Sequence, residues 1–156
     1  MSKNSIKSGA KTRLEHDLLG DKQVPAEALY GVQTLRCIEN FDISRQTLSQ
    51  FPHFIKALGI VKMGAVLANH ELGLIKDDVK NAIVEACQEL MDGKHLEQFP
   101  IDMVQGGAGT SVNMNANEVI ANRALEIMGK ERGEYQFCSP NDHVNMAQST
   151  NDAYPS

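Results

Sequence analysis

The sequence lacks the features that mark membrane-spanning and secreted proteins. No uninterrupted apolar run approaches the roughly 20 residues that a spanning helix needs, and the first residues carry no apolar stretch typical of a secretory signal. The three cysteines are an odd number at wide spacing, which favours reduced thiols over a disulfide framework. These absences predict a soluble, cytoplasmic protein with no membrane partner.

Basic residues are scarce after the first 13 positions. Lys3, Lys7, Lys11 and Arg13 are four of the 15 lysines and arginines, which leaves 11 against 20 acidic residues downstream. Nucleic-acid binding needs a concentrated basic face, so this distribution argues against a nucleic-acid partner. Residues 1–12 are predicted to form a disordered, solvated tail.

Metal-ligand spacing is also absent. The five histidines form no His-x-x-x-His pair and have no neighbouring Cys-x-x-Cys sequence, so no metal site is predicted. What the chain does contain is typical of a globular domain: 156 residues, 42% of them hydrophobic and 22% charged. A chain of this length and composition can bury a sizeable core.

Apolar residues recur mainly with the helical period. The stretches with this period are residues 25–40, 52–72, 77–91 and 110–128. Pro25 suits the first turn of a helix, and Asp77 or Asp78 could cap the third one. Residues 14–24 are predicted to be short extended segments. The predicted fold class is therefore mainly α, with short extended segments and long loops.

The last predicted helix has an unusual composition, because asparagine is a poor helix former. At 100° per residue Asn113 and Asn117 share one face, while Asn115 and Asn122 lie on a nearly opposite one. Two polar faces are hard to reconcile with a single solvated side. We expect these amides to bind neighbouring loops or subunits, and some of them to face solvent in this chain.

Two loops carry candidate binding residues. The stretch 105–111, Gln-Gly-Gly-Ala-Gly-Thr-Ser, leads into a predicted helix and could bind an anion, although Thr110 or Ser111 could equally be a plain helix cap. Residues 149–152, Ser-Thr-Asn-Asp, offer donors for a carboxylate, although turns commonly use the same residues. His143 could be a general base, but a surface or cap role is commoner for a lone histidine.

Long, ordered stretches of this sequence match those of a known enzyme family. They are Val24-Pro25, Tyr30-Gly-Val-Gln-Thr-Leu-Arg36, Glu39-Asn-Phe41, Gln105-Gly-Gly-Ala-Gly-Thr-Ser-Val-Asn-Met-Asn-Ala-Asn-Glu-Val-Ile-Ala-Asn-Arg123, Ser139-Pro-Asn-Asp-His-Val-Asn145 and Gln148-Ser-Thr-Asn-Asp-Ala-Tyr-Pro155. Together they resemble the aspartase/fumarase superfamily from about Arg13 onward. Ala108 and the last stretch are more similar to its aspartases than to class II fumarases.

The resemblance implies a role for several residues of the two loops. Thr110, Ser149, Thr150 and Asn151 match substrate-contacting positions, and Gly107, Gly109 and Ser111 would support the anion-binding loop. Fumarases usually carry a histidine of a secondary dicarboxylate site where this chain has Ser139, so no secondary site is expected. The resemblance thus overrides the reading of both loops as caps or turns alone.

The resemblance also implies an activity: reversible anti elimination of ammonia from L-aspartate to give fumarate, in a homotetramer. It implies no organic cofactor, although a divalent metal activates some relatives. The family's catalytic Gly-Ser-Ser-x-Met-Pro loop does not occur in this sequence. No catalytic residue is therefore assigned, and the chain alone is expected to be inactive.

The domain organisation follows from the same resemblance. Residues 13–145 would be the N-terminal helical domain, and residues 146–156 the substrate-binding loop and the start of a central helical bundle. Two alternatives remain open at this point. One is a class II fumarase or another lyase of the superfamily, and the other is a non-catalytic helical module that binds anions.

Overall fold

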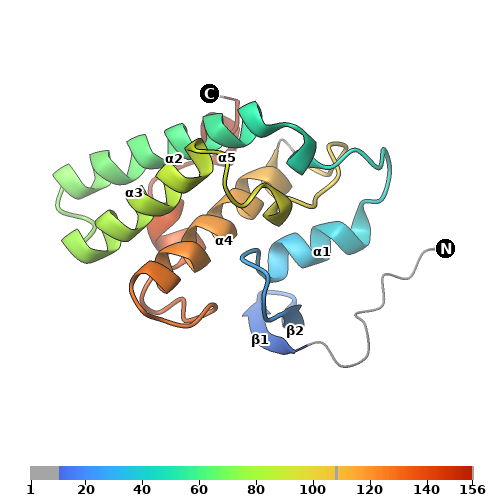
Figure 1. Ribbon diagram of the computed structural model, residues 1–156, viewed down its shortest axis with the longest axis horizontal. Coiled ribbons are helices and arrows are strands. Elements are labelled where there is room, and N and C mark those ends of the chain that lie inside the picture. The colour runs from blue at the N-terminus through green and yellow to red at the C-terminus, as the bar shows by residue number, and fades with distance from the viewer. Residues whose placement is uncertain (1–10, 108, 156) are drawn as a thin grey trace.

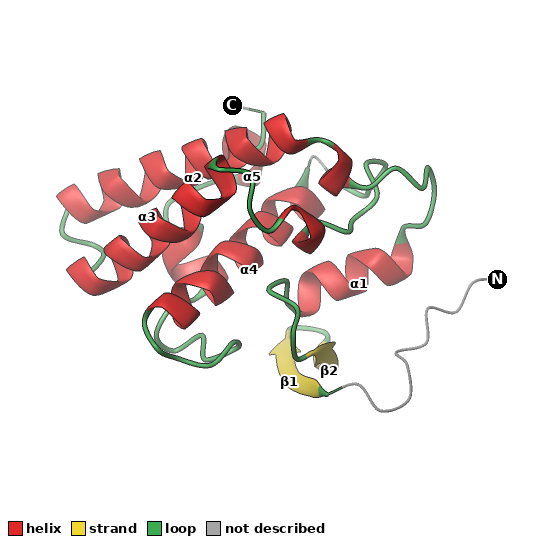
Figure 2. Cartoon of the chain, viewed as in Figure 1, coloured by secondary structure: helices red, strands yellow, loops and turns green. Residues whose placement is uncertain are grey.

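The computed structural model describes residues 11–107 and 109–155, and it is mainly helical (Figure 1, Figure 2). The helices are α1 (Val32–Asn40), α2 (Pro52–Glu71), α3 (Asp77–Met91), α4 (Thr110–Ile127) and α5 (Thr150–Ala153), with short 3-10 turns η1 (Leu48–Gln50) and η2 (Leu96–Gln98) and a π-helical turn η3 (Pro140–Val144). The predicted fold class is confirmed. Ala108, Ser156 and most of the predicted tail lie outside the described residues.

A two-stranded hairpin precedes the helices. Strands β1 (Thr12–Asp17) and β2 (Gly20–Pro25) pair in antiparallel register, so that Asp17 lies opposite Gly20. Leu18 and Leu19 form the exposed turn between them. The extended segments predicted over residues 14–24 are therefore confirmed, whereas Thr12, which was placed in the tail, belongs to a strand.

Helix α1 begins at Val32 and not near Pro25, so the predicted start is wrong. Two buried carboxylates from other elements fix the true start by accepting backbone N–H groups of the first turn. Glu118 of α4 accepts from Gly31, Gln33 and Thr34 at 2.8 to 3.0 Å, and Glu15 of β1 accepts from Val32 at 2.9 Å. A carboxylate at a helix N-terminus satisfies donors that have no partner within the helix.

The residues before α1 are held out of a helix by Arg13. Its guanidinium donates to backbone carbonyl oxygens of the 25–30 segment, including those of Ala28 and Tyr30 at 2.7 Å. Gly31 then lies against both carboxylates, because a Cβ there would approach Glu15 Oε2 to 2.6 Å and the Glu118 carboxyl carbon to 2.9 Å. Only glycine leaves room for both acids at this helix end.

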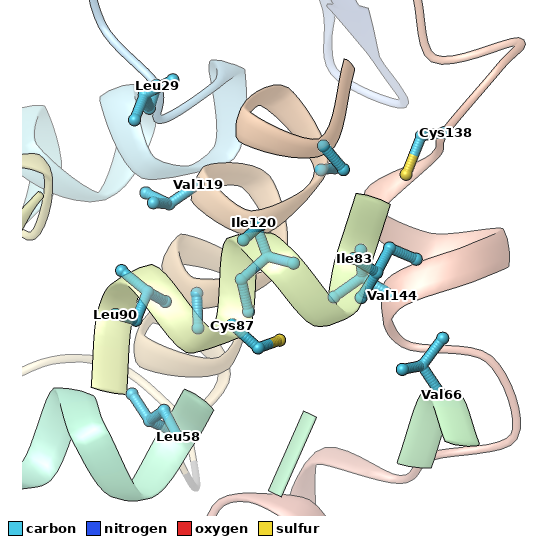
Figure 3. Close-up of a cluster of buried hydrophobic side chains, with 14 of the residues drawn as sticks. Leu29, Leu58, Val66, Ile83, Cys87, Leu90, Val119, Ile120, Cys138 and Val144 are labelled. Carbon is cyan, nitrogen blue, oxygen red and sulfur yellow. The ribbon is translucent and has the colours of Figure 1, made fainter. Parts of the chain in front are cut away.

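The core lies where α2, α3 and α4 pack together. Helix α3 lies between the other two, and its Ile83, Cys87 and Leu90 point into the cluster that Figure 3 shows. The apolar stripes predicted for residues 52–72 and 77–91 form these helices. One detail is wrong: Lys76 occupies the N-cap position of α3, so Asp77 and Asp78 lie in its first turn, near the positive end of the helix dipole.

Helix α4 is the centre of the molecule. Every residue from Val112 to Asn122 is buried, and the four asparagines are at most 1% exposed. The prediction that the amides bind neighbouring segments is confirmed for Asn113, Asn115 and Asn122, whereas Asn117 Nδ2 donates to Met114 Sδ of the same helix. The prediction that some of the amides face solvent is wrong. Loops of the same chain cover both polar faces: Asn115 Nδ2 donates to Gln98 O, Asn122 Nδ2 to Leu29 O, and Asn122 Oδ1 accepts from Gly133 N.

An ion-pair cluster joins α3 to α4. Arg123 donates to both carboxylate oxygens of Glu89, at 2.6 and 2.9 Å, and His95 Nε2 lies 2.7 Å from the same carboxylate. A two-point pair of this kind is stronger than an ordinary surface ion pair, because its geometry is fixed. It joins the C-terminal end of α3 to the C-terminal part of α4.

The variant Glu89→Gln is expected to flatten the dependence of stability on pH in acid. The Arg123 guanidinium, with His95, lowers the pKa of Glu89 from 4.5 to about 2, so the native protein takes up this proton later than the unfolded chain does. The stabilisation is therefore complete above pH 4.5 and is lost as the pH falls towards 2.

Urea unfolding at intervals between about pH 5 and pH 3 measures this effect. The wild-type protein should lose more stability across that interval than Glu89→Gln does. Glu85→Gln, an exposed change on the same helix, is the control and should behave as wild type. Parallel curves for Glu89→Gln and wild type would contradict the assignment.

Candidate functional site

The glycine loop before α4 is shaped by two residues in the left-handed region. Gly107 has φ 77° and Gly109 has φ 84°, which side chains other than glycine rarely tolerate. Gly109 is the N-cap residue of α4, and no side chain caps the helix at that position. Thr110 and Ser111 therefore lie inside the first turn, and the alternative that either one is the N-cap is wrong.

A hollow of about 420 Å³ opens between this loop and the end of the described chain. We call it the Asn151 hollow. It is lined by Met103, Gln105, Gly107, Gly109, Asn151, Tyr154 and Pro155. The structure thus brings three predicted site residues from two distant segments to one concave surface. Its volume is within the range of small-molecule sites.

Tyr154 closes one side of the hollow against the glycine loop. A Cβ at Gly109 would overlap the Tyr154 ring, so the ring is in direct contact with the loop backbone. The ring also meets Phe54 of α2 edge to face, with centroids 5.7 Å apart. Glycine at position 109 is therefore needed both for its backbone angle and for this close approach.

The other predicted site residues do not line this hollow. Thr110 and Ser149 are exposed, and Thr150 is half-buried. The Thr110 hydroxyl folds over the loop, 3.0 Å from where a Cβ of Gly107 would stand. Ser111 instead lines a separate hollow beside α1. Four predicted contacts thus gather at this end of α4, whereas the Ser111 side chain lies elsewhere.

A buried lysine beneath this site was not predicted. Lys62 of α2 is 1% exposed, and its ammonium donates to three amide oxygens: Asn113 Oδ1 at 2.7 Å, Gln148 Oε1 at 2.8 Å and Asn145 Oδ1 at 3.0 Å. Burial lowers the pKa of Lys62 to about 8. The sequence carries one signal of it, since a lysine stands where the apolar stripe of residues 52–72 requires a core residue.

Asn113 connects this lysine to the predicted site. Its Nδ2 donates to Thr150 Oγ1 at 3.2 Å and to Asn145 Oδ1 at 3.1 Å. The loop that precedes α5 is therefore tied to α2 and α4 through side-chain amides. This accounts for one of the asparagines that helix propensity alone does not explain.

His143 takes part in the turn η3. Its Nδ1 accepts a hydrogen bond from Ser139 N at 2.9 Å, and Ser139 Oγ accepts from the backbone N–H groups of Asn141 and Asp142. The cap role that is common for a lone histidine is thus the one observed. Its role as a general base stays a hypothesis.

Within residues 11–107 and 109–155, no group of three or more His, Cys, Asp or Glu side chains is placed to hold a metal ion. Among the helices of that same part of the chain, none is both long enough and apolar enough to span a bilayer.

The variant Gly109→Ala tests the contact between the glycine loop and Tyr154, with Gly129→Ala as its matched control. Both glycines have positive φ, so both variants should lose about 1 kcal/mol of stability from backbone strain. Only position 109 meets the tyrosine ring, because nothing lies within 4 Å of a Cβ at Gly129. Gly109→Ala should therefore lose a further 1–3 kcal/mol or so in urea unfolding; equal losses would argue against the contact.

Comparisons with known proteins identify the family of this chain. A family model described as Lyase matches residues 20–156. Aspartate ammonia-lyases of Helicobacter pylori strain J99 and Escherichia coli strain K12 are 60% and 58% identical over 144 residues, which is 92% of this chain but 31% and 30% of theirs.

Solved structures superpose closely on the same region. A fumarate lyase:delta crystallin from Brucella melitensis bound to cobalt has a TM-score of 0.92 at 53% identity, and a class II fumarase from Schistosoma mansoni has 0.85 at 38%. Each match covers 93% of this chain and 32% and 30% of those chains. The chain therefore spans about a third of the length of the relatives it matches. It belongs to the lyase family, the aspartase/fumarase superfamily that its motifs indicate.

Proposed function

We propose that this chain is the N-terminal, substrate-binding part of an aspartate ammonia-lyase, which eliminates ammonia reversibly from L-aspartate to give fumarate. The observation that carries the proposal is the Asn151 hollow, where the glycine loop meets Asn151, next to Ser149 and Thr150 in the chain. The identity of 58–60% to aspartate ammonia-lyases supports the choice of substrate. The class II fumarase is less similar, at 38%.

The reaction needs donors fixed around one carboxylate. Removal of the proton from Cβ leaves negative charge that collects on the oxygens of the adjacent β-carboxylate. Hydroxyl and amide donors that are already in place stabilise this charge more in the transition state than in the ground state. Ser149, Thr150 and Asn151 are suited to bind that carboxylate, and Thr110 to seat the other end of the substrate.

In this proposal, the catalytic base and the other substrate contacts come from other segments of the complete subunit. Residues 13–145 form the helical scaffold, and residues 146–156 lead from the substrate loop into a central helical bundle. The assembled enzyme is a cytoplasmic homotetramer with no nucleic-acid or membrane partner and no organic cofactor. A serine from another segment removes the Cβ proton.

The variant Asn151→Ala, in the complete subunit that carries this chain, is expected to lower kcat/KM for L-aspartate by about a hundredfold to a thousandfold. Loss of one preorganised donor to the developing charge typically costs that much. Absorbance of fumarate measures the rate. Asn81→Ala, an exposed change on α3 outside the hollow, is the control and should leave kcat/KM unaltered.

Assays of the unmodified subunit with L-aspartate, and with malate in parallel, decide between the lyases. Ammonia release from L-aspartate is expected; turnover of malate alone would identify a fumarase. Binding of aspartate or fumarate with no turnover of either would favour the non-catalytic module. An Asn151→Ala subunit as active as wild type would remove Asn151 from the site.

The 156-residue chain by itself is expected to show no turnover of L-aspartate. It lacks the Gly-Ser-Ser-x-Met-Pro sequence that carries the family's base, so the Cβ proton has no acceptor in place. The same absorbance assay, with the complete subunit as positive control, measures this. Fumarate formed in proportion to the amount of this chain would contradict it.

A further inference from the structure

Lys62 is an unusual buried cation, because its three acceptors are all neutral. Each hydrogen of the ammonium has an amide oxygen, from Asn113, Asn145 or Gln148, so its hydrogen-bonding capacity is filled. Its charge is not neutralised by these partners, and buried charges are normally paired with an opposite charge. The hydrogen bonds of Lys62 to the described residues include none to a carboxylate.

The lysine also sets the direction of the hydrogen bonds around it. An ammonium can only donate, so the amide of Asn113 must turn its oxygen towards Lys62 and its Nδ2 away. That Nδ2 donates to Thr150 Oγ1 at 3.2 Å. Because the Thr150 oxygen already accepts, its own hydrogen is available to a group on the outer side.

The bonds therefore form one directed chain, from Lys62 through Asn113 to Thr150. Hydrogen bonds that run in the same sense polarise one another and become stronger, the more so where the dielectric is low. The end of the chain is a hydroxyl donor at the half-buried Thr150, next to Asn151 of the hollow. An anion at that place would receive both the donor and the positive charge behind it.

We propose that Lys62 is a positioning residue that fixes the Thr150 hydroxyl as a donor and whose buried charge is balanced by a carboxylate of the bound substrate. The inference rests on the proposed function and deepens it, because it assigns the source of positive charge for the site. A lysine that only ties the loop in place would satisfy the same hydrogen bonds, so the test must separate charge from attachment.

The variants Gln148→Glu and Gln148→Met separate the two roles. Both remove the Gln148 Nε2 bond to Val144 O, so that loss is common to them. Glutamate keeps an acceptor for Lys62 and adds the missing negative charge, whereas methionine removes the acceptor and stays neutral. If the charge of Lys62 serves the substrate, Gln148→Glu should have the higher KM.

The expected result in the complete subunit is a KM for L-aspartate roughly tenfold or more higher in Gln148→Glu than in Gln148→Met, about the weight of one charge-assisted hydrogen bond. The inhibition constant of succinate, a dicarboxylate without an amino group, should shift in the same direction. The inference would be overturned if the KM for L-aspartate and the inhibition constant of succinate were as high in Gln148→Met as in Gln148→Glu, or higher. Both variants keep Lys62, so the test does not depend on the folding of a lysine variant.

Lys62→Met provides a second measurement, with the exposed Lys56→Met on the same helix as control. It should raise the KM for L-aspartate, and it should also lower the thermal unfolding midpoint, because the amide oxygens of Asn113, Asn145 and Gln148 lose their donor. Gln148→Met removes one of these hydrogen bonds but keeps the charge, so a KM in Lys62→Met no higher than in Gln148→Met would overturn the role of the charge. A wild-type subunit that is inactive on L-aspartate would refute the proposed function itself. If the wild-type subunit is active but the KM of Gln148→Glu is no higher than that of Gln148→Met, only this inference is refuted.

Discussion

The whole molecule depends on the requirement that polar groups buried on α4 must be hydrogen-bonded. This helix is covered on all sides, yet its buried stretch includes four asparagines and Glu118. An unpaired buried polar group is costly, so Glu118, Asn113 and Asn122 select what may pack beside them. Among the described residues of this helix, the Oδ1 atoms of Asn115 and Asn117 are the exceptions that have no partner. Asn122 Oδ1 accepts a hydrogen bond from the backbone of the loop at residue 133, and the Glu118 carboxylate accepts from the backbone at the start of α1. Asn113 Oδ1 accepts from the lysine of α2. The fold is thus organised by polar contacts that radiate from one helix.

The sequence predicts best those elements whose evidence is local. Helices α2, α3 and α4 follow from apolar periodicity, because burial of a stripe is visible in any window of a few turns. The start of α1 could not be predicted in this way, because the carboxylate that fixes it, Glu118, lies 87 residues from Gly31 along the chain. Periodicity does not predict the role of Lys62 either, because it counts apolar residues and does not show what a lysine on the apolar stripe binds.

In the candidate site, too, the sequence predicts which residues take part but not how their side chains are placed. Family motifs marked Gly107, Gly109 and Asn151, which line one hollow, but they could not reveal that Ser111 lines another. A motif records which residues recur together, whereas the direction of a side chain depends on helix phase. The amides of Asn113, Asn145 and Gln148 lie within the stretches that match the family, but the match assigns them no role, and only their contacts with Lys62 do.

The way in which α1 is capped has a consequence for its hydrogen exchange. In an ordinary helix the first amides have no intrahelical partner and exchange rapidly with solvent. Here the amides of Gly31 to Thr34 are bound by carboxylates that belong to β1 and α4. Their exchange requires these carboxylates to move away from α1, so the end of the helix that would normally fray is expected to be protected from exchange.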